Sequence, residues 1–403
     1  MIHVCFGLHD ADGKYSKFVG ASMASIFENT SAPVTVHILH DATLKNDNRD
    51  KFSYLAGRYG QRVNFHNVEE LCPDEINFLR NTLADKINLR FSIGAFYRLL
   101  IKEILQRRGV NRAIYLDADI IVNLDIAELW RQNLRKFPLA AVSEIDATFD
   151  EMMKEKYLLD SGLVKTENYF CSGVILFNLN ALDEKFFYDG VQFLVDNPAC
   201  ESPDQDILNA FFSENYLKLE QKFDSFVLAE LRKNFPAANK IYHYAGRGIG
   251  LDYKNPYDNL WLENFALTPW FNADTLKNLA EKFRKISDKY VKLIQWMMIY
   301  ANGKRRAVVA FPENFEVLKT IFEFNDNDTF VELNTDLTEL VEKMQAERGQ
   351  TIFYIFWEYY SDLKDKLISL GFKEYLHFVS GEEFLTRVQL SRPRPEYDLI
   401  LEL

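Results

Sequence analysis

The chain has 403 residues, 48% of them apolar, which is enough for two folded domains. Its net charge of −12 argues against nucleic acid as a partner. Its four cysteines are scattered without a Cys-x-x-Cys pair, so no thiolate zinc site is expected and the thiols are predicted to be reduced. The first residues lack the features of a signal peptide, and no apolar run reaches the length of about 18 residues that a membrane span needs. We therefore expect a cytoplasmic protein.

The first two thirds of the chain alternate predicted strands with predicted helices. This order predicts an α/β fold with a mostly parallel, doubly wound sheet and helices on both faces. Ligands bind such sheets beyond the carboxyl ends of the strands. The expected strands are 2–6, 34–39, 62–65, 113–122, 139–142, 169–179 and 240–246, and the expected helices are 15–28, 47–60, 93–107 and one that begins at Pro203.

Two carboxylates, Asp117 and Asp119, lie within the apolar and β-branched run of residues 113–122. Such a run is typical of a buried parallel strand, where charged groups are rarely tolerated unless they are paired or bind a metal. Oxygen ligands suit Mg²⁺ or Mn²⁺, which often hold phosphate groups. The alternative is that Asp117 caps a turn and Asp119 is solvated. An isolated Asp-x-Asp pair does not decide between the two.

Further polar residues follow predicted strands or begin helices at other points of the chain. His9 and Asp10 follow the first strand, and His243 lies near the end of the strand at 240–246. Asp204 and Asp206 lie in the first turn of a helix, where the dipole favours acids for structural reasons alone. Taken singly, His243 would be a core histidine and Arg98 would pair with a surface acid. Their joint occurrence in this order favours one shared site.

These segments together resemble the family 8 glycosyltransferases, retaining enzymes that include lipopolysaccharide galactosyltransferases. The resemblance covers residues 1–270 and implies a GT-A fold, a nucleotide-sugar donor that is most often UDP-linked, and Mn²⁺ or Mg²⁺. It rests on Asp117-Ala-Asp119, Ser92-x-x-x-Phe-Tyr-Arg98, Tyr169-Phe-Cys-Ser-Gly-Val174, Asp204-Gln-Asp-Ile-Leu-Asn209 and His243-Tyr-Ala-Gly246.

The resemblance also implies roles for individual residues. Asp117, Asp119 and His243 would be the metal ligands. Catalysis would involve Gln205, Asp206, Asp204 and Arg98, with Gln205 or Asp206 near the anomeric carbon. Because no second carboxylate is obviously paired as nucleophile and acid, we favour a front-face attack in which the leaving phosphate acts as base. The residues expected to bind the donor are His9, Asp10, Asp12, Tyr15, Ala118, Glu144, Cys171, Ser172, Gly246 and Lys254.

This sequence departs from the family pattern at several of these positions. The nucleotide loop around His9 and Tyr15 is longer than in many relatives, so which of its acids contacts the base is open. Cys171 replaces a frequent Asn, and Glu144 stands where Asp is common. An insertion follows His243, which leaves Lys254 as the first candidate for a diphosphate contact and Arg247 as its rival.

The composition changes after residue 270. Residues 276–306 contain nine Lys or Arg and two acids among apolar residues, which predicts a basic amphipathic helix within a linker at 271–302. This helix either packs on a neighbour or docks on an anionic membrane surface. Residues 303–403 predict a small Rossmann-like domain. The turn after its first strand, at Pro312, lacks the Gly-x-Gly-x-x-Gly that a dinucleotide requires.

We therefore expect a metal-dependent retaining glycosyltransferase that moves a hexose from a UDP-sugar to a cell-surface glycan, a lipid-linked acceptor or a protein-linked acceptor. A homodimer and peripheral contact with the inner face of the plasma membrane are further expectations. One alternative is a catalytically silent sugar-nucleotide-binding or assembly protein. A haloacid-dehalogenase-type phosphatase also uses an Asp-x-Asp, but its later Gly-Asp acids are absent from the sequence.

Overall fold

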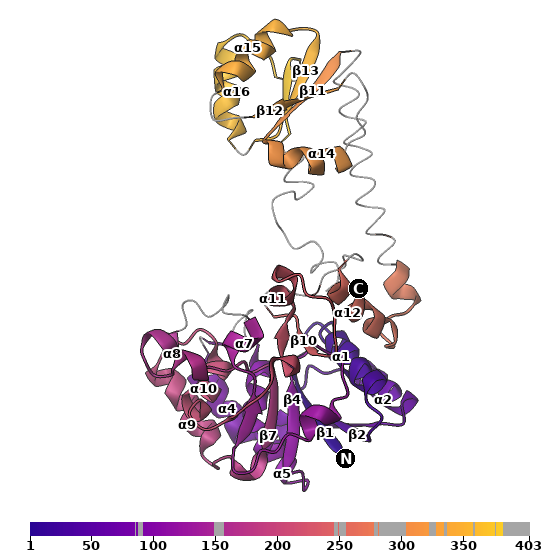
Figure 1. Ribbon diagram of the computed structural model, residues 1–403, viewed down its shortest axis with the longest axis vertical. Coiled ribbons are helices and arrows are strands. Elements are labelled where there is room, and N and C mark those ends of the chain that lie inside the picture. Colours follow the sequence, from indigo (N-terminus) through magenta and orange to yellow (C-terminus); the bar gives the residue numbers. More distant parts are fainter. Residues whose placement is uncertain are drawn as a thin grey trace. The chain divides into compact units, whose positions relative to one another are not determined.

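The chain forms two compact units, one comprising Met1–Thr275 and the other lying within Leu276–Asp398. The computed structural model (Figure 1) describes residues 1–84, 86–87, 92–148, 157–245, 249, 255–277, 281, 304–321, 328–333, 337–357, 359–374 and 376–381. Most of the predicted linker helix at 276–306 lies outside these residues. The division into 1–270, 271–302 and 303–403 therefore stays a prediction.

The first unit is built on a seven-stranded sheet in the order β3-β2-β1-β4-β7-β6-β8. Its strands pair in parallel except for β7, which runs antiparallel to both β4 and β6. This is the mixed, mostly parallel sheet that the sequence predicts. The strands are β1 (Ile2–Leu8), β2 (Val34–His40), β3 (Arg62–Asn67), β4 (Arg112–Leu116), β6 (Leu139–Ala141), β7 (Val174–Asn178) and β8 (Leu217–Lys218).

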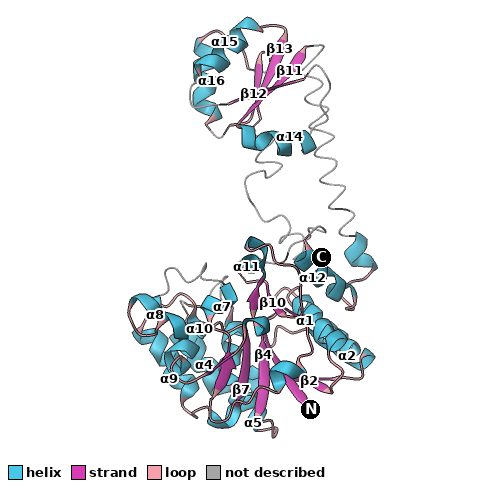
Figure 2. Ribbon diagram, in the orientation of Figure 1, coloured by secondary structure: helices cyan, strands magenta, loops and turns pink. Residues whose placement is uncertain are grey.

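Alternate side chains of the central strands enter two separate hydrophobic cores, one on each face of the sheet. Val4 and Ile114 belong to the core that α1, α2 and α12 cover, whereas Cys5 and Tyr115 belong to the core that α4, α5, α9 and α10 cover. Figure 2 shows these two groups of helices on opposite sides of the strands. Their bounds are α1 (Ser16–Asn29), α2 (Asn46–Arg58), α4 (Pro73–Thr82), α5 (Ile101–Gln106), α9 (Phe186–Asp196), α10 (Pro203–Phe212) and α12 (Pro256–Ala266).

The apolar run around the Asp-x-Asp pair is not one strand. It divides into β4 and β5 (Ile120–Val122), and β5 belongs to a second, three-stranded sheet in the order β5-β10-β9. In that sheet β10 (Ile241–His243) pairs antiparallel with β5 and parallel with β9 (Ser225–Phe226). The two carboxylates therefore occupy a turn between two sheets, and the pairing of His243 with Ile120 brings the histidine beside them.

The helix predicted at 93–107 is wrong in its first half. Residues Ile93–Leu100 form a 3-10 helix, and only Ile101–Gln106 form the α-helix α5. A Cβ atom added at Gly94 would lie 2.9 Å from the backbone nitrogen of His9, and one added at Gly7 would lie 2.6 Å from the Gly94 carbonyl oxygen. The 3-10 segment thus crosses the end of β1 at backbone contact, which accounts for the two glycines.

The second unit contains a four-stranded parallel sheet in the order β12-β11-β13-β14. It has its own hydrophobic core, formed by residues such as Val309, Phe353 and Leu367. The final strand, β14 (Phe378–Ser380), follows a turn at residues 376–377. The other elements are β11 (Arg305–Ala310), β12 (Thr329–Glu332), β13 (Thr351–Ile355), α14 (Phe315–Ile321), α15 (Thr338–Ala346) and α16 (Tyr360–Ser369).

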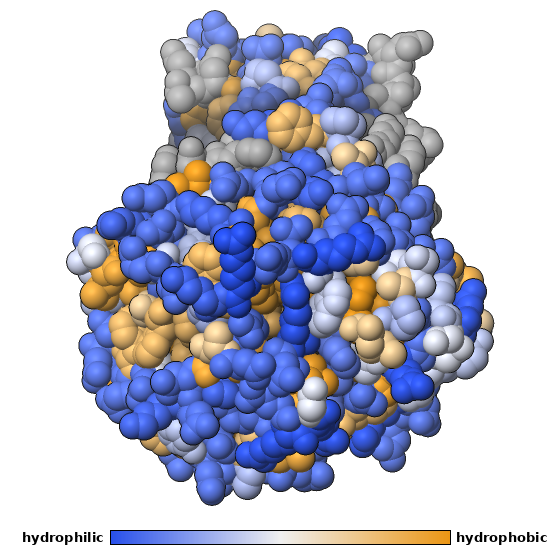
Figure 3. Space-filling view, turned by 60° about the horizontal axis from the view of Figure 1, so that its bottom comes forward, coloured by the Kyte–Doolittle hydropathy of each residue, from blue (hydrophilic) through white to orange (hydrophobic). Residues whose placement is uncertain are grey.

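Hydrophilic side chains cover most of the face of the first unit that is seen in Figure 3, with apolar side chains gathered in smaller patches between them. Tyr188, Val195 and Phe211, on α9 and α10, are among the exposed large apolar side chains. No helix within the described ranges is both long enough and apolar enough to cross a membrane.

Candidate active site

A cavity of about 450 Å³ lies at the carboxyl ends of β1 and β4, which is where ligands bind in open α/β sheets. Its size suits a nucleotide-sized ligand. Most of the residues that the sequence singles out contribute to its wall. The lining residues are Gly7, His9, Tyr15, Ser92, Gly94, Ala95, Arg98, Tyr115, Asp117, Ala118, Asp119, Glu144, Cys171, Ser172, Ser202, Asp204, Gln205, Phe226, His243 and Ala245.

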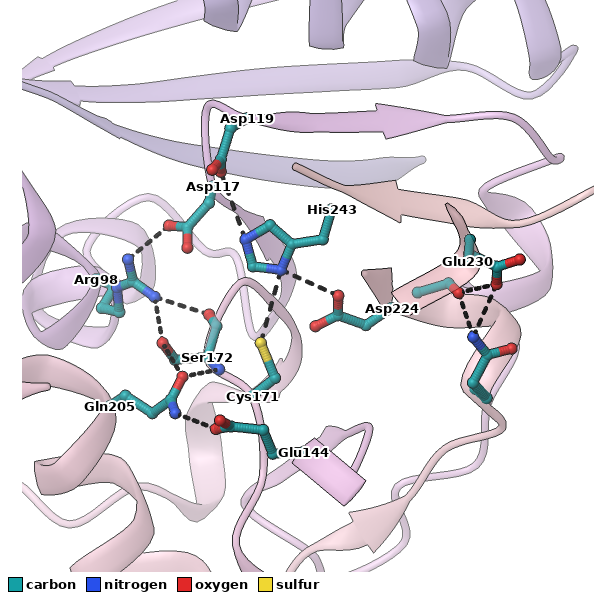
Figure 4. A network of polar contacts seen from close by, with 12 residues as sticks. Arg98, Asp117, Asp119, Glu144, Cys171, Ser172, Gln205, Asp224, Glu230 and His243 are labelled. Atoms are coloured by element: carbon teal, nitrogen blue, oxygen red, sulfur yellow. Dashed lines mark hydrogen bonds and ion pairs between the residues drawn. The ribbon is translucent and has the colours of Figure 1, made fainter. Parts of the chain in front are cut away.

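Asp117, Asp119 and His243 converge on one point of the cavity wall. One carboxylate oxygen from each aspartate and one ring nitrogen of the histidine all lie within 4.8 Å of one another. Nε2 of His243 is 3.5 Å from Oδ1 of Asp119. Both aspartates are partly exposed and the histidine is buried. Figure 4 shows the two aspartates on one side of the imidazole ring. Two carboxylates and an imidazole with open positions facing a cavity form a suitable donor set for Mn²⁺ or a similar divalent cation.

The buried side of the His243 ring is held by other groups. Nδ1 lies 3.1 Å from Oδ1 of Asp224, and Sγ of Cys171 lies 3.6 Å from the same nitrogen. Phe226 packs edge-on against the ring, at 4.7 Å between centroids. A Cβ atom at Gly173 would lie 2.3 Å from Cε1 of the ring, so the close packing of this loop requires glycine.

Arg98 is 4% exposed and links three parts of the site. Its Nη2 donates to Oδ1 of Asp117 at 2.5 Å, and its Nε lies 3.1 Å from Oδ2 of Asp204. Its Nη1 donates to the carbonyl and hydroxyl oxygens of Ser172 at 2.7 and 2.9 Å, and the guanidinium stacks over the ring of Tyr115. The arginine therefore holds the turn of Asp117, the start of α10 and the Ser172 loop in fixed positions.

The charges of the site are strongly coupled. Burial raises the pKa of Asp117 to about 6, although the guanidinium of Arg98 opposes this rise. Burial also disfavours the charged form of Asp119, but the neighbouring His243 brings the pKa of Asp119 below its usual value. Burial disfavours protonation of His243, yet Asp224 and Asp119 together raise its pKa well above the ordinary value. The two neighbouring carboxylates therefore favour the protonated form of this histidine.

Gln205 lies in the first turn of α10 with both ends of its amide occupied. Its Oε1 accepts from the backbone nitrogen of Ser172 at 3.0 Å, and its Nε2 donates to Oε2 of Glu144 at 2.6 Å and to the hydroxyl of Tyr169 at 3.1 Å. Asp206, the next residue of α10, is buried and does not line the cavity. Its carboxylate accepts hydrogen bonds from the hydroxyl of Tyr169 and from the backbone nitrogen of Ser202.

The loop after β1 divides its polar residues between the cavity and the fold. His9 lines the cavity, and its Nδ1 is 2.6 Å from Oδ2 of the buried Asp41, which also accepts from the hydroxyl of Tyr97. Asp10 is fully buried and accepts from backbone nitrogens at the start of α1. Asp12 is exposed and accepts from a backbone nitrogen within the loop. Of His9, Asp10 and Asp12, only His9 lines the cavity.

The structure brings together most of the residues that the sequence selects. Asp10, Asp12 and Asp206 lie outside the lining of the cavity, and Gly246 and Lys254, with Arg247, lie outside the described residues. Sequence reasoning missed the buried acids that face the two site histidines. Asp41 directly follows β2, so its place at a strand end was a usable signal. Asp224 precedes a strand of only two residues, and the sequence gives no sign of it.

The chain is similar to known glycosyltransferases over this same region. The sequence profile of glycosyl transferase family 8 matches residues 8–248. General stress protein A of Bacillus subtilis is 24% identical over 280 residues, which cover 64% of this chain and 92% of that protein. The lipopolysaccharide 1,2-glucosyltransferase of Escherichia coli is 25% identical over 61% of this chain and 71% of its own length.

Among solved structures, that of the galactosyltransferase LgtC, crystallised with donor and acceptor sugar analogues, superimposes with a TM-score of 0.52 at 19% identity. The superposition covers 66% of this chain and 96% of that one. At this level of identity the likeness concerns the fold alone.

Proposed function

Because the chain belongs to glycosyltransferase family 8 and has a GT-A fold, we propose that it transfers a hexose, with retention, from a UDP-sugar to a cell-surface glycan, a lipid-linked acceptor or a protein-linked acceptor. The observation that carries this proposal is the convergence of Asp117, Asp119 and His243 on a nucleotide-sized cavity. The relatives support glycosyl transfer in general, and the donor, the metal and the acceptor are the proposed parts.

A divalent cation fits the three converging side chains. Asp117 and Asp119 offer carboxylate oxygens, and Nε2 of His243 faces Asp119 while Nδ1 is engaged elsewhere. His243 lies between the carboxylates of Asp119 and Asp224, and a cation beside Nε2 would offset the negative charge of the two aspartates on its side of the ring. When bound, Mn²⁺ or Mg²⁺ would neutralise charge on the diphosphate of the leaving group.

The other cavity residues have separable tasks in this proposal. Tyr15 and His9 lie on the nucleotide loop and would contact the base and ribose. Arg98 has its donors engaged by Asp117, Asp204 and Ser172, so it would position the metal ligands and the sugar pocket. Ser172 and Cys171, with Glu144, would shape the donor-sugar pocket.

The carboxylates near Gln205 do not form the nucleophile and acid pair of a retaining glycosidase, which are about 5–5.5 Å apart and both face the substrate. Asp204 is paired with Arg98, and Asp206 points away from the cavity. We therefore favour attack on the front face, in which an oxygen of the leaving phosphate takes the acceptor proton and the amide of Gln205 supports the developing charge. A glycosyl adduct trapped on Asp204 or Asp206 would contradict this.

The experiment that tests the function is a screen of donors by thermal shift and hydrolysis. UDP-glucose, UDP-galactose and UDP-N-acetyl sugars are each run with and without Mn²⁺, on the natural protein and on Asp119→Ala. We expect a Mn²⁺-dependent shift and slow hydrolysis with one donor, both of them lost in the variant. Donor binding without any turnover would favour a sugar-nucleotide-binding protein, and no Mn²⁺-dependent binding of any donor would refute the proposal.

A further inference from the structure

Asp224 is a fully buried carboxylate that no part of the proposed reaction uses directly. Its Oδ1 lies 3.1 Å from Nδ1 of His243, and its Oδ2 has no hydrogen-bond partner within the described part of the chain. Moving a carboxylate out of water is costly unless an opposite charge lies close by. His243 and the cation expected on its far side are the groups that could supply this charge.

The geometry around His243 gives its two ring nitrogens different tasks. A neutral imidazole has one N–H and one lone pair, and the partner of one nitrogen decides which form is present. The Asp224 carboxylate accepts, so it favours the form of the ring with a proton on Nδ1, and Nε2, which faces Asp119, is then the nitrogen that can donate its lone pair to a cation. Cys171 also approaches Nδ1, but burial raises the pKa of its thiol and its sulfur is a weak acceptor.

The segment that carries Asp224 is fixed by a second buried network (Figure 4). Oε1 of Glu230, which is 0% exposed, accepts from Nζ of Lys240 at 2.6 Å and is also bonded by Ser225 and Gln221. Glu230 belongs to α11 (Val227–Arg232) and Ser225 to β9, whereas Gln221 and Lys240 lie just before β9 and β10. The network therefore joins these segments to one another. The hydrogen bonds of this network therefore fix the segment next to Asp224. A residue that orients a neighbouring side chain needs such support.

We propose that Asp224 is the positioning residue of the metal centre: it accepts the Nδ1 proton of His243 and so keeps Nε2 as a lone-pair donor aimed at the cation between Asp117 and Asp119. This inference rests on the proposed function, because it concerns the affinity of the same metal site. An anionic acceptor also makes the imidazole a better donor, and loss of such a partner typically weakens metal binding by about 10–100-fold.

The test measures Mn²⁺ binding directly, by the electron paramagnetic resonance signal of free Mn²⁺ in titrations of the full-length protein. Asp224→Asn keeps the shape and can still accept a hydrogen bond, but it removes the charge, and we expect affinity to fall about 10-fold. Asp224→Ala removes the acceptor as well, and we expect a loss nearer 100-fold. Asp119→Ala, which removes a ligand, should abolish specific binding.

Glu103→Gln is a matched control. Glu103 also has a carboxylate oxygen without a partner in the described structure, it lies in α5, and it does not line the cavity. We expect this variant to bind Mn²⁺ as the natural protein does. If both Asp224 variants fold by circular dichroism and bind Mn²⁺ within twofold of the natural protein, while Asp119→Ala does not bind, the positioning role is refuted and the proposed function stands.

A second measurement separates positioning from a general structural role. For Asp224→Asn, the Mn²⁺ concentration that gives half-maximal donor hydrolysis should rise about 10-fold, and kcat at saturating Mn²⁺ should return to the natural value. A fall in kcat that excess Mn²⁺ does not restore would overturn the inference. Failure of the natural protein to bind Mn²⁺ at all would refute the proposed function instead, so the two failures can be told apart.

Discussion

Nε2 of Gln205 donates to Oε2 of Glu144 at 2.6 Å, and this contact fixes the orientation of the amide. The reverse orientation would place the amide oxygen against the carboxylate and the NH₂ group against the backbone N–H of Ser172. Neither contact would then be a hydrogen bond. Glu144 thus determines which atoms Gln205 can present at the cavity, although it is not itself expected to take part in bond breaking.

We predict that Glu144→Ala lowers kcat for donor hydrolysis by about 10–100-fold, since a hydrogen bond to a charged group contributes roughly 1.5–3 kcal/mol. The affinity for Mn²⁺ should not change, because Glu144 lies outside the metal ligands. Asp146→Ala is the matched control, as Asp146 lies on the same helix, α7 (Glu144–Thr148), and bonds to Ser143 outside the cavity. Equal hydrolysis by the two variants would contradict the role given to Glu144.

We predict that Arg98→Ala lowers the free energy of unfolding by about 3–5 kcal/mol, because it leaves the Asp117 and Asp204 carboxylates facing each other without their shared cation. Arg98→Lys should also be destabilising, since a single ammonium group cannot serve both acids and the Ser172 loop. Urea titrations measure the loss. Added Mn²⁺ should restore part of the stability of Arg98→Ala by offsetting the charge of Asp117, and a loss below about 1 kcal/mol would contradict this account.

The sequence was sufficient to place most strands of the main sheet and to select residues that the structure brings together at one cavity, since apolar runs mark buried strands and polar residues follow their ends. It could not show that the run around Asp117 and Asp119 turns from one sheet into another, because both halves are equally apolar. The sequence also could not predict the 3-10 helix that contains Arg98, because that segment is shaped by backbone contact with β1 rather than by its own side chains.

The partners of the site residues were harder to predict than the residues themselves. Asp41 and Asp224 act through contacts that join segments 32 and 19 residues apart in the sequence. The position of Asp41 after a strand was a signal for the site but did not identify His9 as its partner, and nothing in the local pattern of Asp224 separates it from an ordinary loop acid. For Asp10 and Asp206 the motif was visible in the sequence, but their contacts in the structure are with the fold rather than with the cavity. The carboxylate of Asp10 accepts from a backbone nitrogen at the start of α1, and that of Asp206 accepts from the hydroxyl of Tyr169.

A row of three histidines predicts how stability depends on pH. Nδ1 of His3 lies 3.0 Å from Nε2 of His37, and Nδ1 of His37 lies 2.9 Å from Nε2 of His66, across β1, β2 and β3. Burial lowers the pKa of His37 to about 3 and that of His66 to about 4, with further lowering by neighbouring cationic groups. The native state keeps both rings neutral while the unfolded chain takes up protons below pH 6.5.

The free energy of unfolding is therefore highest above pH 6.5, where both rings are neutral in the folded and the unfolded chain. It falls as the pH drops below 6.5 toward the native pKa values, about 4 for His66 and about 3 for His37. At pH 5 the loss is about 2 kcal/mol for each ring, from a difference of roughly 1.5 pH units below the unfolded pKa. We predict that the difference in unfolding free energy between pH 7.5 and pH 5 shrinks by about 2 kcal/mol in His66→Leu. Urea titrations at the two pH values measure it, and an unchanged difference would contradict the prediction.

The second unit has its own sheet and its own core, so the chemistry of the first unit should not depend on it. Among the residues that the structure describes, those that line the cavity all belong to the first unit. We predict that deletion of residues 303–403 leaves the rate of donor hydrolysis within about twofold of the full-length value, because water as acceptor needs only the donor site. Hydrolysis assays and circular dichroism of the shortened protein test this. If hydrolysis is lost while the shortened protein remains folded, the two units are functionally coupled, and the second unit then contributes to donor turnover rather than to the acceptor or a partner.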